Sequence, residues 1–420
     1  MPNIFSLYLK KIKLKSLSSI YYTIFEGLSK GGSYLLLLII ASAISDDLYI
    51  KILILMSFEA IITMLYFSYN SSVLYALKDN KIELYFNYSL KSSITQIIIF
   101  YIIYLSFKDF IDSYFEYNLS FLIIVLLGNG FLVNIIRQYS VLFQLELKHS
   151  KAIFYKSIPF FVSFLFTLIL FFLLDDKIMA FFLGKFVGLL LFLLYIFYNE
   201  KGFLIKHKFS WTTFNFFFNR VKYSSLVAIL GWASGLGFLN FVKFYSKNER
   251  DLLVLGLILN LFVILQMVAN GINQVYAPKL KVIYLESKQK GISYLKKTHL
   301  VYFFLSVSLV VLVSITLIWK DLLIYYFKNI EVIFDNGNLY VVIMIFFISS
   351  FWWVASPFFM ILDLFKTFFK LNVSLNIIAW LLIVLLYNLG FNNFILYFLI
   401  IKLSVSIGTY FYLKLKILQA

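Results

Sequence analysis

The chain has 420 residues and a formal net charge of +17, yet 62% of its residues are hydrophobic and only 14% are charged. A water-soluble protein of this length cannot bury so many apolar side chains, so the composition excludes a soluble globular class and predicts an all-α integral membrane protein. The absence of cysteine excludes disulfides and thiolate chemistry.

Apolar runs bounded by charged or turn residues predict about twelve membrane-spanning helices. In chain order, the predicted spans cover residues 20–44, 50–70, 93–107, 119–143, 157–174, 178–198, 223–245, 252–275, 300–319, 339–361, 371–388 and 393–413. No small-residue cleavage site precedes Asp46, so we expect the first span to be a retained anchor and not a signal peptide.

Lysine and arginine alternate along the chain with these spans. If the N-terminus is cytoplasmic, every inner segment carries at least two basic residues and no outer segment carries more than two. This pattern is the positive-inside rule, and it predicts that both termini are cytoplasmic. The basic excess is therefore a topology signal, and we expect no nucleic-acid partner, because that role needs a basic patch on a water-exposed fold.

The longest inner stretch, residues 199–222, lies between the sixth and seventh spans. It joins a basic run at Lys206 to an aromatic run that starts at Trp211, which is typical of an interfacial amphipathic connector. The halves on either side look related, since Gly27-x-x-x-Gly31 and Gly231-x-x-x-Gly235 recur at an offset of just over 200 residues. We therefore predict two six-helix bundles, 1–210 and 211–420, with a pseudo-twofold axis along the membrane normal.

Glycine pairs four residues apart predict sites where two helices approach closely in lipid. Three such pairs lie in the predicted spans: 27/31, 184/188 and 231/235. A cluster of acidic residues after the third span, which includes Asp109 and Asp112, is expected to be an ordinary solvated outer loop.

Charged residues inside the spans are the most informative polar feature, because burying a charge in a bilayer is costly. Glu26 and Lys30 are four residues apart, share one helix face and can pair. Glu59 lies near the middle of the second span, where it faces either a functional cavity or a structural partner. For the other charged residues, snorkelling to the interface or helix–helix contact is at least as well supported. These residues are Arg137, Lys185, Lys243 and Lys402.

Amide side chains gather on the eighth span, where Gln266, Asn270 and Asn273 share one face. Amides suit sugar hydroxyls and phosphate oxygens, but they also form interhelical hydrogen bonds, and both interpretations stay open. The sequence has no metal-ligand cluster and no phosphate-binding glycine loop after a strand, so we expect no metal, no cofactor and no enzymatic activity.

With these features the chain resembles the polysaccharide flippase family, which includes O-antigen flippases and is related to the multidrug and toxin exporters. The likeness rests on the six-plus-six layout and on the start of each half, Ser18 to Lys78 and Tyr223 to Lys279. It extends to the tail, with Pro357 in the tenth span and Asn376 in the eleventh.

The resemblance implies a secondary transporter in the bacterial cytoplasmic membrane that moves an undecaprenyl-diphosphate-linked O-antigen or capsule repeat unit by ion-coupled alternating access. In this hypothesis the lysines attract the diphosphate, the amides contact sugars, and one glutamate couples transport to a proton or cation. The residues concerned are Lys30 and Lys243, then Gln266, Asn270 and Asn273, then Glu26 and Glu59.

Two alternatives remain. One is a multidrug or cation exporter of the related family. The other is a membrane polysaccharide polymerase, which is disfavoured because such enzymes have a large basic outer loop, whereas the longest outer loop here, from Lys320 to about Asn338, is short and net acidic.

Overall fold

The computed structural model describes residues 33, 35–65, 82–145, 149–200, 211–246, 248–326, 331–334, 337–361, 364–391 and 393–417. Within these ranges all regular structure is helical, and each predicted span falls at least partly on a helix. Nine of the described helices are long and apolar enough to cross a membrane, or ten when one sharply bent pair is counted as a span.

The chain forms two compact units. The first unit is Ile50–Trp232, and the second unit consists of the chain up to Tyr49 together with Ala233–Ala420. The boundary predicted at residues 210/211, the connector and the symmetry axis stay predictions. Residues 211–222 of that connector belong to a helix of the first unit, and residues 201–210 lie outside the described part of the chain.

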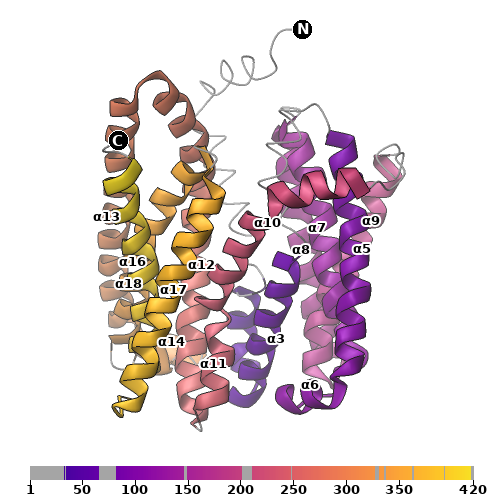
Figure 1. Ribbon diagram of the computed structural model, residues 1–420. Coiled ribbons are helices and arrows are strands. Elements are labelled where there is room, and N and C mark those ends of the chain that lie inside the picture. Colours follow the sequence, from indigo (N-terminus) through magenta and orange to yellow (C-terminus); the bar gives the residue numbers. More distant parts are fainter. Residues whose placement is uncertain are drawn as a thin grey trace. The chain divides into compact units, whose positions relative to one another are not determined.

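The first unit is built around three helices that pack on one another, α7, α8 and α9, with α5 packed against α7 (Figure 1). Its helices are α3 (Asp46–Leu65, which starts in the second unit), α5 (Ile82–Ser106), α6 (Lys108–Phe115), α7 (Leu122–Leu145), α8 (His149–Leu173), α9 (Lys177–Asn199) and α10 (Trp211–Ala233).

The closest helix contact in this unit is made by glycine. A Cβ added at Gly184 would lie 2.4 Å from the Cα of Thr167, and one added at Gly188 would lie 2.4 Å from the Cα of Ser163. The predicted close packing at 184/188 is therefore confirmed, and it joins α9 to α8. The same prediction is wrong at Gly231, which is exposed and would meet nothing within 4 Å. The pair 27/31 lies outside the described residues.

The second unit is arranged around α12, which packs on α13 and α16, while α18 packs on α16 and α17. Its helices are α11 (Phe238–Tyr245), α12 (Glu249–Glu286), α13 (Lys288–Ile318), α14 (Lys320–Tyr326), α15 (Glu331–Phe334), α16 (Asn338–Ile361), α17 (Phe365–Asn388) and α18 (Phe394–Tyr412), followed by a π-helical turn at Leu413–Ile417.

Apolar side chains point outward and polar ones inward. Leu165 and Phe172 on α8 are 56% and 71% exposed. Asn134 on α7 is buried, and its amide donates to the hydroxyl of Ser93 at 2.8 Å. Apolar surface of this extent is stable only against lipid, where internal polar groups must find partners within the protein. The chain is thus a multi-pass membrane protein.

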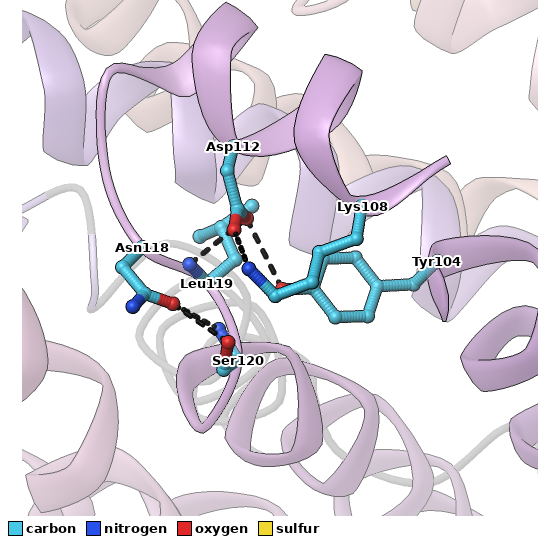
Figure 2. Close-up of polar contacts among 6 residues, drawn as sticks. All are labelled: Tyr104, Lys108, Asp112, Asn118, Leu119 and Ser120. Carbon is cyan, nitrogen blue, oxygen red and sulfur yellow. Dashed lines mark hydrogen bonds and ion pairs between the residues drawn. The ribbon is translucent and has the colours of Figure 1, made fainter. Parts of the chain in front are cut away.

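The acidic segment expected to be a solvated loop is in fact helical. α6 follows α5 after a bend of 86°. The carboxylate of Asp112 on α6 accepts hydrogen bonds from the Lys108 ammonium at 2.6 Å, the Leu119 backbone N–H at 3.0 Å and the Tyr104 hydroxyl at 3.1 Å (Figure 2). Burial by itself raises the pKa of Asp112, but these hydrogen bonds outweigh it and hold that pKa below its usual range.

The predicted span 223–245 is divided. α10 ends at Ala233 and α11 begins at Phe238, and the turn between them closes through short-range bonds such as Phe238 N–H to Gly235 O at 3.0 Å. Glycine lowers the cost of ending a helix inside an apolar run, because it populates turn conformations readily. The break also lies close to the point where the chain passes from the first unit to the second, at Trp232–Ala233.

Candidate functional site

A buried ion pair lies in the membrane-spanning part of the first unit. The Lys185 ammonium on α9 lies 2.8 Å from a carboxylate oxygen of Glu59 on α3. The side chains are 19% and 6% exposed, respectively. Both charges are far from the ends of their helices, so neither side chain can easily reach water. The ion pair takes the place of that hydration.

The orientation of Lys185 follows from how α9 is held on two sides. Gly184 and Gly188 press one face against α8. On another face, Phe182 accepts a hydrogen bond from the Asn129 amide of α7 at 3.2 Å through its backbone carbonyl, and Phe186 lies against Gly128 of α7. At roughly 100° per residue, Lys185 falls between these two faces and away from lipid. The packing of α9 therefore directs the ammonium inward.

The backbone of α3 next to Glu59 has its own support. The indole N–H of Trp232 on α10 donates to the backbone carbonyl of Ser57 at 2.8 Å. One turn after Glu59, the hydroxyl of Thr63 donates to the Glu59 carbonyl at 2.9 Å. These bonds hold the helix around the carboxylate and leave the carboxylate itself to Lys185.

This pair can act as an electrostatic switch. With Glu59 ionised, the two charges compensate each other. Protonation of the carboxylate, or its capture by a cation, leaves the Lys185 ammonium without compensation in an apolar setting.

The second unit contains the amide row that the sequence predicts. Gln266, Asn270 and Asn273 lie on α12 and are each partly exposed. The Tyr302 hydroxyl of α13 donates to the Ala269 carbonyl at 3.1 Å and lies 3.4 Å from the side-chain oxygen of Asn273. Asn273 thus serves at least one interhelical contact, while the side chains of Gln266 and Asn270 form no hydrogen bond with the residues that the structure describes.

The remaining predicted site residues are dispersed. Lys243 lies in the last turn of α11 with a partly buried side chain. Glu26 and Lys30 lie outside the described residues. Sequence reasoning singled out Glu59 but missed Lys185 as its partner, because 126 residues separate them and no spacing rule connects α3 to α9. The only signal was that both are charged residues deep in apolar spans.

No protein-family model matches the chain, and no curated protein sequence matches it. Solved structures do. The eukaryotic MATE transporter AtDTX14 is similar with a TM-score of 0.67 at 10% identity, covering 99% of this chain and 97% of that one. An outward-facing multidrug resistance MATE transporter of the MOP superfamily has a TM-score of 0.66 at 14% identity, and 96% of each chain is covered.

A third similar structure is a MOP superfamily transporter from Pyrococcus furiosus, with a TM-score of 0.65, 14% identity and 96% of each chain covered. At such identities the likeness establishes the architecture alone. The chain has the all-α membrane fold of MATE transporters, with about twelve spanning helices in two six-helix halves.

Proposed function

We propose that the chain is an ion-coupled secondary transporter that exports amphipathic, drug-like compounds. The observation that carries the proposal is the buried Glu59–Lys185 pair inside a fold shared with multidrug resistance transporters. Fold alone does not define function, whereas a buried ion pair that joins α3 to α9 supplies a specific place for coupling.

The coupling step follows from the charge balance of the pair. A proton or a metal cation that binds Glu59 releases Lys185 from its partner, and the uncompensated ammonium favours a conformation in which it reaches water. Loss of the ion restores the pair. In one conformation the ion pair and the substrate site open to one side of the membrane, and in the other conformation both open to the opposite side. Movement of the ion down its gradient then drives substrate export.

The test uses purified protein in proteoliposomes with a fluorescent amphipathic dye as substrate. An imposed pH or sodium gradient should drive dye movement in the wild type. Glu59→Gln should reduce gradient-driven movement to near the rate of empty liposomes, because the amide cannot titrate. Glu59→Asp, which keeps a carboxylate, should retain measurable transport. Equal gradient-driven transport by wild type and Glu59→Gln would contradict a coupling role for Glu59.

A second candidate, the lipid-linked oligosaccharide flippase, rests on the sequence resemblance to polysaccharide flippases. The similar solved structures include a multidrug resistance MATE transporter, so this candidate takes second place. In it, Lys30 and Lys243 contact the diphosphate, Gln266, Asn270 and Asn273 contact sugars, and Glu26 or Glu59 couples an ion. The predicted bacterial cytoplasmic membrane location suits both candidates.

The two candidates are separated in cells. A flippase predicts that outer-leaflet glycan is lost on deletion and restored by the wild-type chain. A drug exporter predicts that deletion sensitises cells to toxic amphipathic cations and leaves the glycan unchanged. Lys30→Ala and Lys243→Ala test the diphosphate assignment, provided that protein levels match those of the wild type.

A further inference from the structure

A lysine lies in the middle of a spanning helix of the second unit. Lys402 is flanked by eight residues of α18 on the Phe394 side and ten on the Tyr412 side. At 1.5 Å per residue the helix ends are about 12–15 Å away, which is beyond the reach of a lysine side chain. Lys402 therefore cannot avoid the membrane interior by snorkelling along its own helix.

The side chain points into the unit and not toward lipid. Its ammonium lies 5.1 Å from the ring centre of Phe262 on α12 and 5.0 Å from that of Phe398, four residues earlier on α18. Phe262 in turn stacks on Trp353 of α16, with ring centres 6.1 Å apart. All three rings are buried, with exposures of 4%, 0% and 3% for Phe262, Phe398 and Trp353.

No acidic residue in the described part of the chain pairs with Lys402. Among the described residues, none of the ion pairs includes it. The sequence from Ala233 onward has acidic residues only at helix ends and in the segments between helices, namely Glu249, Asp251, Glu286, Asp321, Glu331, Asp335 and Asp363. From α11 to α18, the described spans of this unit thus hold a central cation and no central carboxylate of their own to balance it.

Two aromatic faces compensate a buried ammonium only in part, because cation–π attraction is weaker than the hydration that the ion loses. An anion brought by a ligand would supply the rest. Polar groups for such an anion lie nearby on the same helix face: Gln266 follows Phe262 by one turn, and Asn273 falls on that face as well. The lysine and the amide row therefore lie on one side of α12.

We propose that Lys402 and the amide of Gln266 bind an oxyanion group, a phosphate or carboxylate, of an amphipathic ligand whose apolar part lies against Phe262 and Trp353. The ammonium supplies charge, the amide N–H donates a hydrogen bond, and the ring faces accept the apolar portion. The identification of this ligand with the exported substrate rests on the proposed transport function; the binding site itself rests on the second unit alone.

The test measures binding to purified protein in a neutral detergent by isothermal titration, without any gradient. The probes are dodecyl phosphate, inorganic phosphate and dodecyltrimethylammonium. Inorganic phosphate lacks the alkyl chain, and dodecyltrimethylammonium keeps the alkyl chain but has a positive head group. Lys402→Met removes the charge at similar length, Lys402→Arg keeps it, and Lys414→Met removes an exposed charge from the turn that follows the same helix.

We expect dodecyl phosphate to bind more tightly than inorganic phosphate. Lys402→Met should lower the affinity for dodecyl phosphate about tenfold or more, while the affinities of Lys402→Arg and Lys414→Met should stay near that of the wild type. Binding of dodecyltrimethylammonium should not weaken in Lys402→Met. Since Lys402→Met removes an uncompensated charge, it should melt no lower than the wild type. Gln266→Leu provides a second variant with the lysine intact and should weaken dodecyl phosphate alone.

Unchanged dodecyl phosphate binding in both Lys402→Met and Gln266→Leu would overturn the site. Binding of inorganic phosphate alone would overturn the amphipathic ligand. The two proposals can fail separately. Dye movement that does not depend on Glu59 would contradict coupling but not the anion site, and absence of anion binding would contradict the anion site but not coupling at Glu59.

Discussion

Among the described residues, Glu59 pairs with one lysine, Lys185, which makes the pair suitable for a double-mutant cycle. Glu59→Gln or Lys185→Met alone leaves one charge buried without a partner and should destabilise the protein by about 3–5 kcal/mol. The double variant removes both charges and should recover most of that loss. Unfolding of the purified variants in detergent gives the three free energies that the cycle needs.

The cycle separates stability from coupling. The double variant should be nearly as stable as the wild type and still fail to couple dye movement to a gradient, because no titratable group remains at the pair. Additive losses in the double variant would mean that Glu59 and Lys185 do not interact energetically, and would contradict the switch.

A second residue-scale prediction concerns Asp112 on α6. Its pKa is depressed in the folded protein, so the stability it contributes is fully present above the unfolded pKa, near 3.8, and is lost as the pH falls through the lower folded value. Because the site is near the surface, Asp112→Asn should lower the melting temperature at neutral pH by only about 1–3 °C.

The melting temperatures of wild type and Asp112→Asn should converge as the pH is lowered through this range. Glu249→Gln is a control, since this exposed carboxylate makes no ion pair within the described residues. If the difference in melting temperature between wild type and Asp112→Asn stayed constant from neutral to acidic pH, the charge of the carboxylate would contribute nothing to the stability of the folded protein.

At the scale of helices, the α8–α9 contact tests how tightly the first unit is built. Gly184→Ala forces a methyl group to within 2.4 Å of the Thr167 backbone, which cannot rotate away as a side chain would. The helices must separate, at a cost of about 1–3 kcal/mol. Since α9 orients Lys185, the same change should also weaken gradient-driven transport.

Gly231→Ala is the matched control for that substitution. It adds the same methyl group inside a helix where nothing lies within 4 Å, so helix propensity alone acts and stability should rise by up to about 1 kcal/mol. Thermal unfolding of both variants compares them directly. Equal effects of the two substitutions would contradict close packing at Gly184.

The helices themselves were largely predictable, whereas their ends and contacts were not. Hydropathy locates a span because lipid requires an apolar run, but a helix continues beyond the apolar run wherever polar residues favour it. α12 accordingly extends to Glu286, past the predicted end at 275, and α6 was mistaken for a loop because charged residues interrupt its apolar ones. The tertiary partner of Glu59 depends on packing between distant segments, which hydropathy does not encode.

At the scale of the whole chain, the two units differ in how they handle charge inside the membrane. In the first unit the central carboxylate on α3 is paired with a lysine. In the second unit the central lysine on α18 lies among aromatic rings, and the described helices from α11 to α18 carry carboxylates only near their ends. In the proposed function, the first unit binds and releases a coupling ion; in the proposed anion site, the second unit binds the oxyanion group of the ligand.

The membrane topology predicted from the distribution of basic residues can be tested directly, because the chain has no cysteine. Single cysteines at the exposed positions Asp109 on α6 and Glu249 on α12 should react with a membrane-impermeant maleimide in intact cells. Cysteines at the exposed positions Lys288 and Lys366 should react only after permeabilisation. The positive-inside rule assigns the first two positions to the outer side and the last two to the cytoplasm. Labelling of Lys288→Cys or Lys366→Cys from outside, or protection of both outer positions in intact cells, would contradict an even number of spans with cytoplasmic termini.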